Sequence, residues 1–167
     1  VGGLTAGNSP DNHDQILATG NVSLDGRLVI SFPNDYAPAL GESFLLIANN
    51  GDNAISGTFT GLPEGSLLPI NDRLFSVSYI GGTGNDLTVT RIGTVFDVTN
   101  AKQNGIGSLR KALDNANSTV GVDLIRILTP GVLSVTPSWG LPDIAESVSI
   151  DGTAVAGYAG VPLFEIR

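Results

Sequence analysis

The chain has 167 residues, with no cysteine, no methionine and a single histidine. The absence of cysteine excludes a disulfide framework and a thiolate zinc site. The single histidine, His13, lies in an N-terminal stretch without apolar periodicity, which argues against a Ser-His-Asp triad and against a zinc or copper site built from histidines. Because position 1 is not methionine, we expect Val1 to follow a removed segment or to begin a fragment.

Charged residues are also scarce, at 14% of the chain, and 16 acidic residues against 8 basic ones give a net charge of −8. Nucleic-acid binding needs a clustered cationic surface, but Arg110 and Lys111 are the only adjacent basic residues, so we expect no nucleic-acid partner. No apolar run approaches the roughly 20 residues of a membrane helix, so we expect no membrane insertion by this segment.

Turn-forming residues are abundant instead, with 22 glycines and 9 prolines in a chain that is 41% hydrophobic. Short runs of alternating apolar residues, each closed by Gly, Pro, Asn or Asp, predict β-strands. The first half contains the runs NVSLDGRLVISF, ESFLLIANN, GTFTGLP, LFSVSYI and DLTVTRI, and the second half contains GVDLIRILTPGVLSVTP, SVSIDGT and VPLFEI. Within the first run, Asp25-Gly26 predicts either a hairpin turn or the corner of a solenoid.

One short helix is predicted near residues 108–117. Ser108 is placed to cap its N-terminus, and Asn117, Ser118 and Gly121 end it. Apolar residues fall at helical spacing on one face: Leu109, Ala112, Leu113 and Ala116. So short a helix is not stable alone in water. We therefore expect this apolar stripe to cover the exposed end of a β-helix or, alternatively, to pack across a β-sandwich.

These patterns predict a mainly β protein built from short parallel β-helix or β-sandwich-like blocks, with one short capping helix. We divide the chain into a flexible arm (1–14), a β-rich block (15–92) and the helix-capped start of a parallel β-helix (93–167).

Two segments also resemble known families. Residues 14–92 contain the strings GTFTGLPEG and SYIGGTGND, and this segment resembles one that recurs in autotransporter-like passengers and other giant secreted repeat proteins. Residues 94–166 resemble the opening of a right-handed parallel β-helix from large secreted bacterial surface proteins. The resemblance implies a secreted or cell-surface location and carries no catalytic residues over to this chain.

Carboxylate chemistry stays open, since a glycosidase needs just two acids at a suitable separation. The candidates are Asp143, Glu146 and Asp123. Asp143, however, follows Pro142 in an expected loop. We therefore expect no enzymatic activity; if there is one, it is a polysaccharide-active glycosidase or lyase that uses these carboxylates.

Two oxygen-rich loops are candidates for calcium. Residues 81–86 match the start of the calcium-binding nonapeptide G-G-x-G-x-D, although Thr88 replaces the apolar residue expected after it. One copy supplies only part of a coordination shell. Residues 49–53 form a second such loop, so the candidate ligands are Asp86, Asn85 and Asp52. Turn formation is the preferred role of both loops, and no cofactor is expected.

Exposed aromatic residues are candidates for carbohydrate binding, because flat apolar sugar faces stack on aromatic rings. Trp139 and Tyr158 are the candidates. Trp139 lies between prolines in TPSWGLP, and the alternative is that it plugs the mouth of the first coil.

The composition and the resemblance together favour a non-enzymatic structural or adhesive module of a large secreted or cell-surface bacterial protein. The alternatives are a carbohydrate-binding module of a polysaccharide-active protein, or a glycoside hydrolase or polysaccharide lyase on a β-helix. A polysaccharide or another cell-surface ligand is the partner these readings imply. We also expect a homodimer through the C-terminal strand VPLFEIR, because Leu163, Phe164 and Ile166 would otherwise face water.

Overall fold

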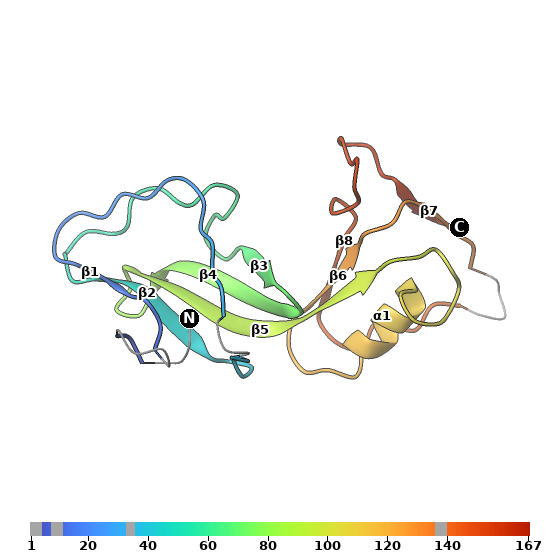
Figure 1. Cartoon of the computed structure of the whole chain (residues 1–167), viewed down its shortest axis with the longest axis horizontal. Helices are drawn as coiled ribbons and strands as arrows, with labels where there is room; N and C mark the ends of the chain where they lie inside the picture. The colour runs from blue at the N-terminus through green and yellow to red at the C-terminus, as the bar shows by residue number, and fades with distance from the viewer. Residues whose placement is uncertain (1–4, 8–11, 33–35, 136–139) are drawn as a thin grey trace. The chain divides into compact units, whose positions relative to one another are not determined.

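The computed structural model describes residues 5–7, 12–32, 36–135 and 140–167 (Figure 1). It divides into two compact units, which are described separately. The first contains Val1–Ile70 and Phe75–Ile92, and the second contains Asn71–Leu74 and Gly93–Arg167. The chain is mainly β with one short helix, in a parallel β-solenoid arrangement of about five turns. The predicted fold class is therefore confirmed.

Five strands contribute to the first unit: β1 (Ile16–Ala18), β2 (Ser43–Asn49), β3 (Leu67–Ile70), β4 (Arg73–Gly81) and β5 (Asp86–Val98). Their order in the sheet is β1-β2-β5-β4-β3. Strand β1 pairs parallel to β2, and β2 pairs antiparallel to β5. Strand β5 is long enough to belong to both units, with its first residues in this one and its last residues in the second.

The chain after β1 continues to run parallel to the chain after β2. The amide of Leu24 donates to the carbonyl oxygen of Ser56 at 2.8 Å, and the amide of Ser56 donates to the carbonyl oxygen of Val22 at 2.9 Å. Further along, the amide of Thr60 donates to Gly26 O. Residues 22–26 therefore pair with the next coil, so the Asp25-Gly26 turn is a solenoid corner rather than a hairpin.

The apolar faces predicted for the first unit point inward. The core contains Phe44, Ile47, Phe75, Val77, Tyr79, Leu87 and Val89, and the partly buried residues packed against it include Val22, Leu24, Leu28, Ile30 and Phe32. The strand predicted at GTFTGLP is wrong, because residues 57–63 contain no strand, only a bend at Gly57 and a turn at residues 60–61. Gly57 and Gly61 both adopt positive φ angles there, which strand geometry excludes. The strands predicted within NVSLDGRLVISF are absent too, apart from an isolated bridge at Ser23.

The second unit consists of two stacks of parallel strands. Its elements after β5 are α1 (Leu109–Ala116), β6 (Asp123–Ile127), β7 (Gly131–Leu133), β8 (Val148–Asp151) and β9 (Phe164–Ile166). The end of β5 pairs parallel to β6, and β6 pairs parallel to β8. Strand β7 pairs parallel to β9 and forms the other stack. Parallel pairing of successive coils is the arrangement expected of a β-helix.

Helix α1 begins and ends close to the predicted residues and lies beside β6 (Figure 1). The hydroxyl of Ser108 accepts a hydrogen bond from the amide of Lys111 at 3.2 Å, which confirms the N-cap. The whole apolar stripe is buried, and it packs with Val98, Ile125, Ile127, Leu133 and Val155. The helix spans eight residues, and the described part of the chain holds no apolar helix of membrane-crossing length.

Coils of the second unit approach each other very closely at Gly93. A Cβ atom built on this residue would lie 1.8 Å from the carbonyl oxygen of Val122. No side chain fits at that distance, so glycine is required where β5 passes the start of β6.

Candidate functional site

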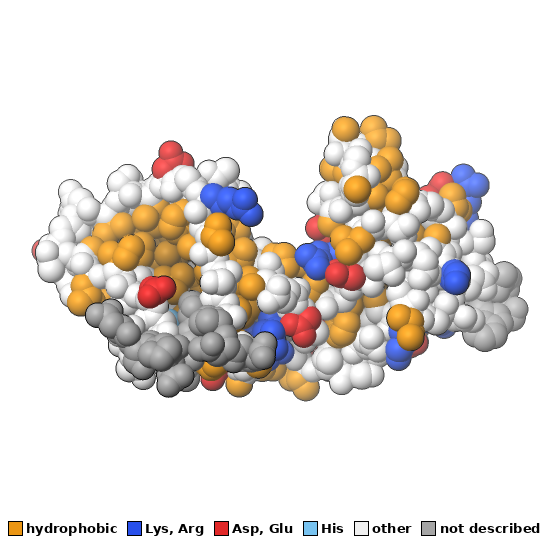
Figure 2. Space-filling model, viewed as in Figure 1, with side chains coloured by type: hydrophobic (Ala, Val, Ile, Leu, Met, Phe, Trp, Pro, Cys, Tyr) orange, Lys and Arg blue, Asp and Glu red, His pale blue; other side chains and the backbone are white. Residues whose placement is uncertain are grey.

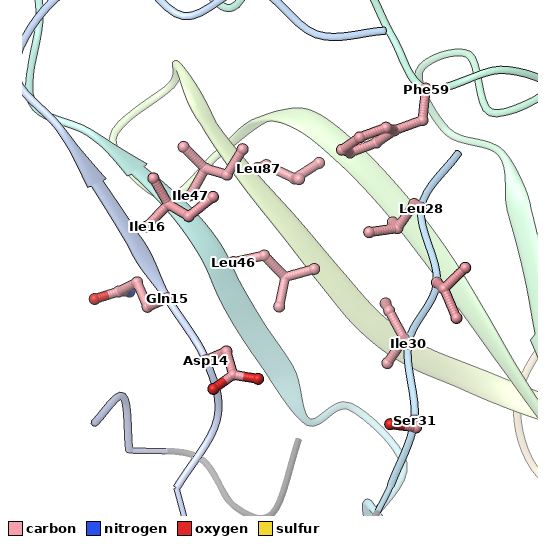
Figure 3. Close-up of a pocket in the computed structure, with 11 residues that line it drawn as sticks. Asp14, Gln15, Ile16, Leu28, Ile30, Ser31, Leu46, Ile47, Phe59 and Leu87 are labelled. Carbon is pink, nitrogen blue, oxygen red and sulfur yellow. The ribbon is translucent and has the colours of Figure 1, made fainter. Parts of the chain in front are cut away.

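An apolar cleft of about 260 Å³ opens in the first unit (Figure 3). Ile16 of β1 forms one wall, Leu28 and Ile30 form the opposite wall, and Leu46 of β2 lies on the floor. Figure 2 shows hydrophobic side chains gathered around this hollow on the visible face of the unit. The cleft is therefore a place where the apolar interior of a coil reaches the surface.

The walls of the cleft follow from strand alternation. In the extended segment 28–31, Leu28 and Ile30 point toward the floor while Val29 is 74% exposed, because successive side chains of an extended chain point to opposite sides. On the other wall, Ile16 is 61% exposed, and β1 pairs only with β2 among the described strands. The wall formed by β1 thus has a strand neighbour on one side only among the described residues.

Polar groups lie at one end of the cleft. Asp14, Gln15 and Ser31 line it there, and the side-chain amide of Gln15 donates to the carbonyl oxygen of Leu45 at 3.0 Å. The lining contains one carboxylate and no imidazole. Such a lining suits an apolar group and provides no acid–base pair for hydrolysis.

The two oxygen-rich loops of the first unit meet in space, although they are separated in sequence. The side-chain amide of Asn85 donates to Gly51 O at 2.7 Å. Together the loops line a second, polar pocket that includes Asp52 and Thr83. The sequence suggested both loops as calcium candidates but gave no sign that they are neighbours.

Asp86 is the centre of this arrangement, and its side chain is only 3% exposed. One carboxylate oxygen accepts from the amide of Asn49 at 2.7 Å; the other accepts from the amide and the hydroxyl of Thr83 at 2.8 and 2.9 Å. Burial alone would raise the pKa of Asp86, but these hydrogen bonds outweigh it and place the pKa below its ordinary value. The carboxylate therefore ties the end of β2 to the β4–β5 turn.

Most of the side-chain oxygens proposed as calcium ligands are already engaged in hydrogen bonds within the protein. Both oxygens of Asp86 already accept hydrogen bonds from backbone amides, and the hydroxyl of Thr83, with one hydrogen to donate, lies 2.9 Å from both Asp86 Oδ2 and Asn85 Oδ1. Asp52 is exposed. The described residues contain no group of three or more His, Cys, Asp or Glu side chains placed to hold a metal ion. Calcium binding stays a prediction, and the geometry fits the turn role better.

The three candidate catalytic carboxylates have different environments in the second unit. Asp123 is fully buried, and it accepts from the amide of Thr94 at 2.8 Å and from the hydroxyl of Thr119 at 2.5 Å. Asp143 and Glu146 are exposed. None of these three carboxylates lines either of the two pockets described above. None of them lines the two cavities beside β9 either.

Of the two aromatic candidates for carbohydrate binding, Tyr158 lies among the described residues. Trp139 lies outside the described residues. Tyr158 is partly exposed and lines a cavity of about 180 Å³ together with Pro162 and Phe164. A single tyrosine beside prolyl and phenylalanyl side chains is a small platform for a sugar ring.

His13 is a residue whose placement the sequence did not indicate. Its side chain is buried, its Nε2 lies 3.2 Å from Leu45 O, and its ring packs edge-on against Phe44 with centroids 5.8 Å apart. A single imidazole without apolar neighbours in sequence gave no signal of this packing. His13 therefore packs into the core of the first unit.

Comparison of the chain with protein-family models, with curated proteins and with solved structures gave no match. The fold defines a mainly β protein with a parallel β-solenoid arrangement. The autotransporter-like identity stays a prediction from the sequence.

Proposed function

We propose that this chain is a structural module, a β-solenoid spacer within a large secreted or cell-surface bacterial protein. The observation that carries the proposal is that the buried carboxylates form structural hydrogen bonds. Asp86 and Asp123, the two buried carboxylates among the described residues, both accept hydrogen bonds from backbone amides of their own unit. A catalytic acid must reach its substrate, whereas these two hold coils together.

Complete pairing of buried polar groups supports the same proposal. Among the described residues, no buried side-chain nitrogen or oxygen lacks a hydrogen-bond partner. Fully satisfied polar networks rigidify a fold, and rigidity is what a spacer requires. The low charge and the absence of cysteine are compatible with a secreted or cell-surface location.

Incubation with a panel of polysaccharides tests this proposal against the enzymatic alternative. We expect no release of reducing or unsaturated ends above the level of a heat-denatured sample. Turnover that disappears in Asp143→Asn or Glu146→Gln would replace the spacer with a glycosidase or lyase. The matched control is Asp25→Asn, which removes an exposed acid from a corner of the first unit.

Calorimetric titration with the same polysaccharides tests the carbohydrate-binding alternative. The spacer predicts no saturable heat. Saturable binding that is weakened in Tyr158→Ala but unchanged in Tyr36→Phe would make the chain a carbohydrate-binding module instead. Tyr36 suits the control because its hydroxyl donates to Glu42 within the first unit.

A further inference from the structure

Two asparagines of the chain, Asn50 and Asn104, are followed directly by glycine. At such a dipeptide the backbone nitrogen of the glycine can attack the side-chain carbonyl carbon of the asparagine, because glycine has no Cβ to hinder the approach or restrict φ. Asn50 lies in the loop that follows β2, and Asn104 lies in the loop that precedes α1. The hydrogen bonds around the two dipeptides differ, so their reactivity should differ as well.

The dipeptide Asn104-Gly105 is open to solvent within loop 99–107. Both residues are exposed, and the next residue, Ile106, is 94% exposed. Neither the side chain of Asn104 nor the backbone nitrogen of Gly105 has a hydrogen-bond partner among the described residues. A Cβ atom built on Gly105 would meet no atom within 4 Å. The attacking nitrogen and the carbon that it attacks are therefore free to meet.

The base of this loop is held by contacts that do not use Asn104. The amides of Thr99 and Asn100 both donate to Gly107 O, at 2.9 and 3.1 Å. The side-chain amide of Asn100 also donates to Ile106 O at 3.0 Å. A change in the side chain of Asn104 therefore leaves the closure of the loop intact.

The other dipeptide, Asn50-Gly51, is held on both sides. The amide of Asn50 donates to Ala18 O at 2.7 Å, and the amide of Gly51 donates to Asn49 Oδ1 at 3.2 Å. Gly51 O accepts from the side-chain amide of Asn85 at 2.7 Å. Attack by the Gly51 nitrogen requires the backbone at Asn50 to rotate and the Gly51 amide to leave its acceptor. The fold therefore opposes the reaction at this dipeptide.

We propose that Asn104 is a site of spontaneous deamidation in the folded protein, and that the fold protects Asn50 from the same reaction. The Gly105 nitrogen gives up its proton to solvent base and forms a bond to Cγ of Asn104. The bond from Cγ to the side-chain nitrogen breaks, ammonia leaves, and a five-membered succinimide ring remains. Water then opens the ring. Opening at Cγ gives aspartate, and opening at the backbone carbonyl gives isoaspartate.

Either product adds one negative charge to the loop, and isoaspartate also adds one methylene group to the path of the backbone. Because water is the only other reactant, the conversion needs no enzyme and advances with the age of each molecule. The exposed surface of loop 99–107 therefore becomes more acidic with time, while the contacts at its base persist.

Peptide mapping of the whole chain after ageing at neutral pH tests the proposal. Trypsin cleaves after Lys102 and Arg110, and the released peptide 103–110 contains Asn104 as its single asparagine. We expect this peptide to gain the mass of deamidation and to separate into an aspartate and an isoaspartate form. In the folded chain Asn104 should react at least about tenfold faster than Asn50, because reaction at Asn50 must first break the hydrogen bonds that hold it. In guanidinium chloride, which unfolds the chain, the two rates should become similar.

Matched variants are Asn104→Gln and Asn50→Gln, because glutamine would have to close a six-membered ring, which is slower. Asn104→Gln should remove the reaction from peptide 103–110, and Asn50→Gln should leave the rate at Asn104 unchanged. Equal rates at Asn50 and Asn104 in the folded chain, or a ratio that unfolding does not change, would overturn the proposal.

Circular dichroism melting compares the aged chain with the fresh chain. We expect the same melting temperature, because the contacts at the base of the loop do not use the modified side chain. A lower melting temperature after ageing would overturn the inference that the fold persists through the modification. None of these outcomes bears on the spacer function, which the polysaccharide assays test separately.

Discussion

A single buried carboxylate, Asp86, determines how the polar turn of the first unit is held. Its oxygens face amide and hydroxyl hydrogens from Asn49 and Thr83. Asp86→Asn places an amide NH₂ where an acceptor is needed, so it should cost about 1.5–3 kcal/mol at neutral pH. Urea denaturation measures the loss. Asp52→Asn in the exposed part of the same pocket is the control and should change stability by less than about 0.5 kcal/mol.

The lowered pKa of Asp86 gives this effect a pH dependence. Because its pKa is lower when folded than when unfolded, its charge contributes stability above the unfolded value of about 3.9. That contribution is lost as pH falls through the lower folded pKa. The difference in unfolding free energy between the wild type and Asp86→Asn should therefore shrink in acid. A difference that is constant from neutral pH down to about 3 would contradict the assigned role.

Gly93 is a second residue at which a single added atom, the Cβ of alanine, should change the stability of the fold. Because a Cβ would lie 1.8 Å from Val122 O, Gly93→Ala must push β5 and β6 apart. We expect a loss of at least about 2 kcal/mol in thermal or urea unfolding. Gly152→Ala is the matched control, since a Cβ there meets no atom within 4 Å. Equal stability of the two variants would show that the coils can separate at no cost.

At the level of elements, helix α1 is stabilised by its packing rather than by itself. Leu113 is buried among residues of the strands. Leu113→Ala should cost about 2–5 kcal/mol, as expected for a core leucine, in chemical denaturation. Val120→Ala, just after the helix and mostly exposed, is the control. A loss below about 0.5 kcal/mol for Leu113→Ala would mean that the stripe does not hold the unit together.

The elements also show what the sequence can predict. Helix α1 was predictable because its cap, stripe and end signals are all local. The inward faces of residues 22–24 and 28–32 were predictable from alternation as well. Their pairing partners were not, because Leu24 bonds to Ser56 in the next coil and alternation specifies a face rather than a neighbour. For the same reason, the meeting of Asp86 with Asn49 was not visible in the sequence.

For the whole molecule, the hydrogen bonds that already occupy both oxygens of Asp86 predict that calcium does not change its stability. A ligand that binds only the folded state raises its stability in proportion to the logarithm of ligand concentration. We expect the same melting temperature in excess calcium and in excess EDTA. A rise with calcium concentration that is lost in both Asp86→Asn and Asp52→Asn would establish a calcium site at the two loops instead.

The parallel register of the second unit has a consequence for how the gene can change in length. One extra codon within β6, between Ile125 and Arg126, would turn Ile127 outward and Arg126 inward, because side chains alternate along the strand. The connections at 99–107 and 156–161 carry no such constraint, since neither contains a strand or a buried residue. Insertion scanning should therefore give a map with intolerant stretches at each coil and tolerant stretches between them. Natural length variation should accumulate in those connections, which makes them the places to graft an epitope or a tag.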